Sequence, residues 1–171
     1  MADAITKDQL LQNLRDGEKE ALALLAGIPP EKFEEGRYES GWNGRQILAH
    51  ITAIEWTYPR LIDLAQGKIQ PKKNPDPKPA AAPTAAFSGG VDDYNNRSIS
   101  RYADASVGEL LEKWREFRAT TIATIEATDA DVFLKPVKSA GGIQGPLGTV
   151  LNMVAYMHVQ THVADIAGSQ A

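Results

Sequence analysis

The chain has 171 residues, 43% hydrophobic and 23% charged, with a net charge of −4 at pH 7, which predicts one ordinary globular domain over residues 1–171. The negative charge and the lack of a basic stripe argue against nucleic acid as a partner, and the lack of cysteine excludes disulfides, thiolate nucleophiles and cysteine-ligated zinc. No window approaches the roughly 18 apolar residues of a membrane span and the N-terminus does not resemble a signal peptide, so we expect a cytoplasmic protein that does not enter the membrane.

Two amphipathic helices are predicted in the first part of the chain. The first covers residues 6–26, where Thr6 and Gln9 fit a capping box and leucines recur at helical spacing. The second covers residues 43–67 and also begins with a capping-box pattern. Pro59 lies inside it, removes one backbone hydrogen bond and predicts a kink. The short connection between these helices favours antiparallel neighbours.

The segment 68–90 is rich in proline and alanine and separates the second helix from the third. Its five prolines and two glycines exclude a long regular element. A disordered linker is one interpretation. A partly ordered lid or dimer arm is another, because compact domains rarely carry so long a loop without a use for it. A short helix is predicted directly afterwards, over residues 91–101.

Two further long helices are predicted in the second half. Ser106 and Glu109 form a third capping-box pattern at the start of a helix that extends to about residue 127. Residues 128–145 are predicted to be irregular. A fourth helix follows from Gly145 or Pro146 to about Ala167, and Gly168 ends it. No segment alternates long enough to predict a strand. The sequence therefore predicts an all-α fold, a four-helix bundle with a long proline-rich connection between helices 2 and 3.

All three histidines fall on predicted inward faces of these helices. His158 and His162 are four residues apart, so they lie on one face of the fourth helix, about one turn from each other. His50 shares a face of the second helix with three isoleucines. The fourth-helix stripe steps by three or four residues through the following positions: Leu147, Leu151, Val154, His158, Thr161 and Asp165.

Two interpretations of the histidines are open at this level. Each could be a core histidine satisfied by its own hydrogen bond. Alternatively, the three could share one divalent cation, which would satisfy one nitrogen of each ring. Neutral imidazole suits zinc, nickel, copper or iron, and three protein ligands leave a position for water or substrate.

Two acidic residues near the histidines are candidates for orienting them. Asp165 lies three residues after His162 and could hold a histidine ring, cap the helix end or face water. Glu55 lies five residues after His50, about 140° round the helix by the 3.6-residue period, which argues against a direct role beside His50. The alternative interpretation of Glu55 is a salt bridge to Arg115 or Arg118.

Three stretches resemble the DinB-like superfamily, which includes the N-terminal domain of mycothiol-dependent maleylpyruvate isomerases. They are "GWNGRQILAHITAIEW", "NNRSISRYADASVGELLEKWREFRATTIATIEA" and "HVQTHVADI". The resemblance implies a four-helix bundle with one divalent metal, zinc or nickel, bound by His50, His158 and His162. It also implies a homodimer, a small-molecule substrate and, in some members, a thiol such as mycothiol or bacillithiol. In the isomerase branch a glutamate is typical at the position of His158, and a second, C-terminal domain follows.

The function predicted from these features is that of a metal-dependent enzyme of the thiol S-transferase or isomerase type. A metal would lower the pKa of a bound thiol or water and so activate it. The alternatives are a metal-dependent hydrolase and a non-enzymatic bundle that binds a small molecule in stress or resistance.

Overall fold

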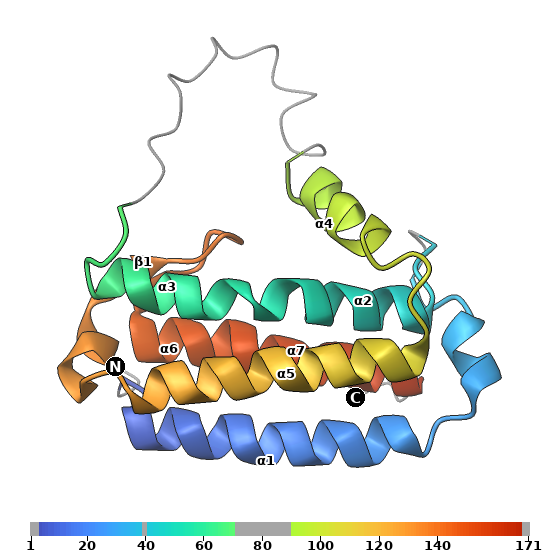
Figure 1. Ribbon diagram of the computed structural model, residues 1–171, viewed down its shortest axis with the longest axis horizontal. Helices are drawn as coiled ribbons and strands as arrows, with labels where there is room; N and C mark the ends of the chain where they lie inside the picture. Colours follow the sequence, from blue (N-terminus) through green and yellow to red (C-terminus); the bar gives the residue numbers. More distant parts are fainter. Residues whose placement is uncertain (1–3, 39–40, 71–89, 169–171) are drawn as a thin grey trace, which may run out of the picture.

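The computed structural model describes residues 4–38, 41–70 and 90–168, and within these ranges it confirms the predicted four-helix bundle. The bundle consists of α1 (Lys7–Ala26), α2 (Gly44–Glu55) continued by α3 (Thr57–Ala65), α5 (Val107–Glu126), and a last segment that ends in α7 (His158–Ala167) (Figure 1). The predicted capping boxes are present at Thr6, Asn43 and Ser106, so each of these helices begins where the sequence indicates.

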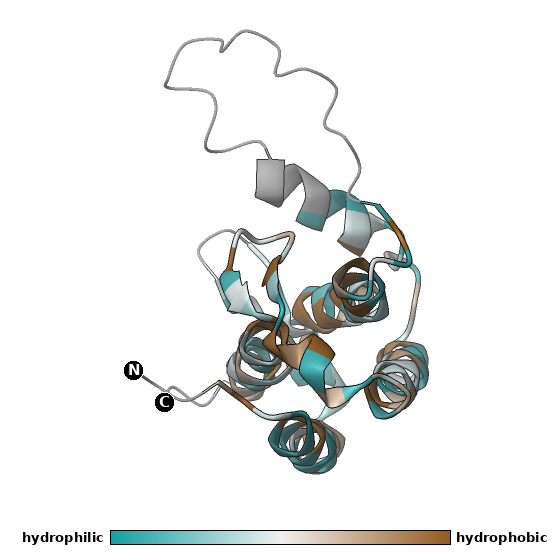
Figure 2. Ribbon diagram, turned by 90° about the vertical axis from the view of Figure 1, so that its left-hand side faces the viewer, coloured by the Kyte–Doolittle hydropathy of each residue, from teal (hydrophilic) through white to brown (hydrophobic). Residues whose placement is uncertain are grey.

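The order of the helices around the bundle differs from the prediction. α2 packs against α5 and α7, and α1 packs against the same two helices, so α1 lies diagonally opposite α2 (Figure 2). The expectation that α1 and α2 are neighbours is therefore wrong. The connection between them includes a 3₁₀ helix, η1 (Pro30–Glu34), and carries the chain across the end of the bundle. Figure 1 also shows that α2 and α5 run in the same direction.

The core lies between the helices, on their apolar faces. Among the side chains without solvent exposure are Leu10, Leu14, Ile47, Trp114 and Leu151, which come from all four long segments. The burial of such side chains is the main favourable term in folding and contributes about 1.5–3 kcal/mol for each large apolar residue.

The second helix is interrupted rather than merely kinked. α2 ends at Glu55, a turn follows at Trp56, and α3 begins at Thr57. Pro59 explains the position of the break, because it has no N–H to donate to the Glu55 carbonyl four residues earlier. At the same break, the Thr57 hydroxyl donates to the Ile54 carbonyl at 2.6 Å.

The fourth helix contains a π-helical segment that the sequence did not predict. It consists of α6 (Leu147–Leu151), the π segment η3 (Asn152–Met157) and α7. A π turn holds more residues than an α turn, so positions four apart stay in line. The buried stripe accordingly consists of Leu147, Leu151, Ala155, Val159, Val163 and Ile166. The predicted inward stripe through Val154, His158 and Thr161 is wrong beyond Leu151, and Thr161 is exposed.

Short elements complete the described fold. The predicted helix over residues 91–101 is present as α4 (Gly90–Ser100), which packs on α2. The segment 128–145, predicted to be irregular, contains the 3₁₀ helix η2 (Ala130–Leu134) and strand β1 (Pro136–Lys138), which pairs antiparallel with β2 (Gln144–Pro146). Figures 1 and 2 place α4 and this hairpin on one side of the bundle.

Most of the predicted 68–90 loop or lid falls outside the described residues. Within the described residues, every helix is too short or too polar to pass through a membrane.

Candidate metal centre

The three histidines lie together where α2 packs against α7. His50 comes from α2, His158 is the first residue of α7, and His162 follows one turn later. One nitrogen from each ring lies within 4.8 Å of the other two. The Nε2 atoms of His158 and His162 are 2.9 Å apart, and the His50 ring centroid lies 5.6 Å and 5.1 Å from theirs.

His50 forms the deep wall of this cluster. Its side chain is 5% exposed, and its Nδ1 atom is buried without a hydrogen-bond partner among the described residues. The Trp42 ring packs against it with centroids 5.3 Å apart. His158 and His162 are less buried and border the surface of the bundle. The cluster thus has one closed, apolar side and one accessible side.

All three imidazoles are held in their neutral form at pH 7. Burial, followed by the proximity of the other two histidines, lowers the pKa of His50 to about 3. Burial and His158 lower the pKa of His162 to about 4, although Asp165 acts in the opposite direction. Burial also lowers the pKa of His158, and a hydrogen bond to the Val154 backbone opposes that shift. Neutral imidazole is the form that binds metal ions.

Asp165 lies beside His162, where the sequence placed it as a candidate, and a tyrosine joins them. The Tyr38 hydroxyl donates to the Asp165 carboxylate and lies 2.8 Å from His162 Nδ1. The same carboxylate is 3.5 Å from that nitrogen. Burial and the bond to Asp165 raise the pKa of Tyr38, so the phenol stays protonated. Sequence reasoning missed Tyr38, because it lies in a loop without hydrophobic periodicity.

The described residues next to Tyr38, which are 36–38 and 41–43, are tied to each other and to α7. Gly36 and Asn43 form an antiparallel bridge, and the Arg37 N–H donates to the Trp42 carbonyl at 2.8 Å. The Arg37 guanidinium donates to the Ile166 carbonyl near the end of α7 at 3.2 Å. These contacts place Tyr38 and Trp42 at the histidine cluster, although the loop is distant from α7 in sequence.

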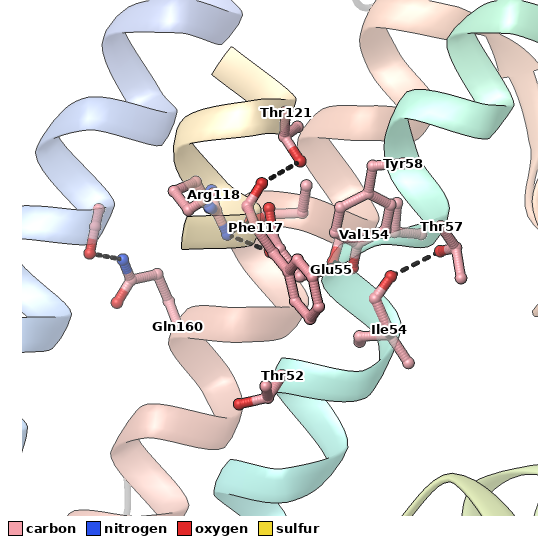
Figure 3. A network of polar contacts seen from close by, with 12 residues as sticks. Thr52, Ile54, Glu55, Thr57, Tyr58, Phe117, Arg118, Thr121, Val154 and Gln160 are labelled. Carbon is pink, nitrogen blue, oxygen red and sulfur yellow. Dashed lines mark hydrogen bonds and ion pairs between the residues drawn. The ribbon is translucent and has the colours of Figure 1, made fainter. Parts of the chain in front are cut away.

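Glu55 belongs to a different network, deeper in the bundle. Its carboxylate pairs with Arg118 at 2.9 Å, and the two side chains are 0% and 2% exposed (Figure 3). The alternative interpretation of Glu55 as a salt-bridge partner of Arg118 is thus confirmed. Burial raises the pKa of Glu55, and Arg118 acts against that shift. Among the described residues, this carboxylate makes no hydrogen bond to the histidines.

The same network holds the π segment that precedes His158. Arg118 also donates to the Ala155 carbonyl at 2.8 Å. The Tyr58 hydroxyl donates to the Val154 carbonyl at 2.7 Å, and Figure 3 shows these two residues side by side. Side chains from α5 and α3 therefore satisfy carbonyls of η3. The π segment ends at Met157, directly before His158, and π segments occur often at functional sites.

Comparison with known proteins places this helical arrangement in a family. The family model of the DinB superfamily matches residues 13–166. The chain belongs to the DinB superfamily. A comparison with curated proteins finds no match. Solved structures of the DinB type are similar to the chain throughout the bundle, at identities that indicate a shared fold and no more.

Three of these solved structures are similar to this chain in fold. The mycothiol-dependent maleylpyruvate isomerase has a TM-score of 0.70 and 19% identity, with 94% of this chain covered. The chain spans 60% of the length of that isomerase. The colibactin self-resistance protein ClbS, solved in complex with a dsDNA, has a TM-score of 0.63 and 15% identity, with 100% of both chains covered. YfiT from Bacillus subtilis is described as a probable metal-dependent hydrolase with an unusual four-helix bundle topology. It has a TM-score of 0.64 and 14% identity, and the match covers 95% of this chain and 85% of the YfiT chain.

Proposed function

We propose that His50, His158 and His162 bind one divalent transition metal ion, zinc or nickel, and that the protein uses it in chemistry on a small molecule. The observation that carries this proposal is the separation of 2.9 Å between the Nε2 atoms of His158 and His162. Two neutral imidazoles at that distance need either a shared proton or a shared cation between them.

The surroundings of the rings favour the cation. Tyr38 and Asp165 lie at Nδ1 of His162 and can take the proton of that nitrogen. The Val154 backbone can take the other ring proton of His158 in the same way. Both Nε2 atoms would then present lone pairs to each other, which is unfavourable unless a positive ion lies between them.

The dimensions of the cluster suit the proposed metals. Zinc–nitrogen bonds of about 2.0–2.1 Å place two tetrahedral ligands about 3.3 Å apart. The observed bounds of 2.9 Å for one pair and 4.8 Å for the whole set bracket that value. His50 contributes one nitrogen within 4.8 Å of the other two ligand atoms, so a third bond from its largely buried ring would complete the set.

The reaction class that we favour is thiol S-transfer or isomerisation on a small substrate. A bound divalent metal supplies Lewis acidity, which lowers the pKa of a thiol or water in the open position. The chain's own residues hold three neutral nitrogens on one side and leave the surface side accessible. The similarity to a mycothiol-dependent isomerase supports this class, and the description of YfiT supports metal-dependent hydrolysis as the second. A homodimer is part of the same proposal.

One observation favours a non-enzymatic alternative, in which the bundle binds a small molecule without turnover. The two acids predicted near the histidines are both engaged elsewhere: Tyr38 holds Asp165 behind His162, and Arg118 holds Glu55 in the core. Neither is placed as a general base at the accessible side. Turnover assays with thiols and electrophiles, run beside binding titrations, separate the two: binding without turnover supports the alternative.

Metal content measured on protein purified without a histidine tag tests the proposal. We expect one zinc or nickel per chain after dialysis against either ion, and loss of that metal in His50→Ala, His158→Ala and His162→Ala. Thr161→Ala, an exposed substitution on the same helix, is the matched control and should bind as the wild type does. A folded wild-type protein that binds neither ion would overturn the proposal.

A further inference from the structure

We propose that Tyr38 and Asp165 are positioning residues that fix the ring proton of His162 on Nδ1 and thereby leave its Nε2 free to bind a metal. The inference rests on the proposed function, since it concerns a ligand of the proposed site. It adds a residue from outside the helices, Tyr38, to the histidine cluster.

The direction of the hydrogen bonds follows from the chemistry of the groups. A carboxylate only accepts, so the single proton of the Tyr38 hydroxyl goes to Asp165. Toward His162 Nδ1, at 2.8 Å, the hydroxyl then offers only a lone pair. A hydrogen bond at that distance requires the proton to be on Nδ1. A neutral imidazole with its proton on Nδ1 has a bare Nε2, and that atom faces His158.

The carboxylate strengthens the same assignment. Asp165 Oδ2 is 3.5 Å from His162 Nδ1, so its negative charge lies on the side of the ring that carries the proton. Carboxylates and other acceptors placed behind a ligating histidine fix its tautomer and raise the basicity of the metal-facing nitrogen. Tyr38 and Asp165 form that arrangement as a chain from imidazole to phenol to carboxylate.

The loop that carries Tyr38 contacts two of the three histidines. Tyr38 lies at His162, and Trp42 packs on His50 with ring centroids 5.3 Å apart. Arg37, the residue before Tyr38, donates to the Ile166 carbonyl near the end of α7. Tyr38 and Trp42 therefore contact a histidine of α7 and a histidine of α2, respectively.

Tyr38 does not act on substrate in this assignment. Its hydroxyl contacts Nδ1 of His162, whereas the other nitrogen of the ring faces the cluster. A role through the ring, rather than at the reacting atoms, follows from that position. Its removal should therefore change the affinity for metal and the tautomer of His162 while leaving the fold intact.

The test compares Tyr38→Phe and Asp165→Asn with wild type in two measurements. In competition with a chromophoric chelator, each variant should bind Zn²⁺ about 10–100-fold more weakly. The double variant should lose less than the product of the two single losses, because both act in one chain. Tyr102→Phe, a partly buried tyrosine outside the cluster, is the matched control and should bind as the wild type does.

The second measurement reads the tautomer directly in metal-free protein. Imidazole ¹⁵N–¹H correlation spectra should show His162 as the Nδ1–H tautomer in wild type and as a mixture in Tyr38→Phe, with unchanged thermal unfolding. An Nε2–H tautomer in wild type, or wild-type Zn²⁺ affinity in both variants, would overturn the inference. A wild-type protein that shows the Nδ1–H tautomer but binds no metal would instead contradict the proposed function and leave the tautomer assignment standing.

Discussion

Protonation of buried His50 should make the metal-free protein lose stability as the pH falls. The pKa of His50 is lowered to about 3 in the folded chain by burial and by its two neighbouring histidines, against 6.5 for an ordinary histidine. The unfolded chain therefore binds a proton at a higher pH than the folded chain does. The contribution of neutral His50 to the free energy of unfolding is therefore fully present above about pH 6.5, and it is lost as the pH falls toward 3.

The size of the effect follows from the two pKa values. A pH of 5 is about 1.5 units below the pKa of His50 in the unfolded chain, so the residue is protonated there. In the folded chain His50 is still neutral at that pH. At about 1.36 kcal/mol per unit, the folded state is about 2 kcal/mol less stable than at pH 8 on account of His50. The side chain is only 5% exposed, so solvent screening changes this value little.

Urea unfolding of chelator-treated protein at pH 8 and pH 5 measures this difference. His50→Gln removes the titrating group and keeps a polar side chain of similar length. Its free energy of unfolding should therefore fall by about 2 kcal/mol less than that of wild type between pH 8 and pH 5. Every other titrating group is common to both proteins. An equal loss in wild type and variant would refute the inference that His50 is buried in its neutral form.

Three further substitutions test the fold of the bundle. Arg118→Met leaves the Glu55 carboxylate buried without its cation and should lower the free energy of unfolding by about 3–5 kcal/mol in urea titrations. Gly148→Ala would place a methyl group against the Ile5 carbonyl oxygen, closer than van der Waals contact, and should cost about 1–3 kcal/mol in the same assay. Ser106→Ala removes a helix cap far from the histidines and should cost about 1 kcal/mol in thermal unfolding without changing Zn²⁺ affinity.

The features of the fold that depend on local sequence were predictable. Thr6, Asn43 and Ser106 each begin a helix because a capping box satisfies free N–H groups within a few residues of the cap. Pro59 predicted a kink in the second helix, and the break at Trp56 follows from the missing N–H of this proline. The convergence of His50 with the α7 histidines was also accessible, because each lies close to the apolar stripe of its helix.

Features that depend on contacts between distant segments were not predictable in this way. The π segment relies on Arg118 and Tyr58, which donate to its carbonyls from other helices, and no pattern within residues 152–157 reports those donors. Tyr38 reaches His162 from a segment distant in sequence, and Arg37 ties that segment to α7. The strands β1 and β2 are too short to show an alternating pattern.

Anomalous diffraction from crystals of the protein loaded with zinc tests the central claim most directly. We predict one anomalous peak between α2 and α7, within about 2.0–2.1 Å of one nitrogen from each of His50, His158 and His162. A crystal structure of the zinc-loaded protein with no peak at these three rings, or with its peak on other side chains, would contradict the proposed metal centre.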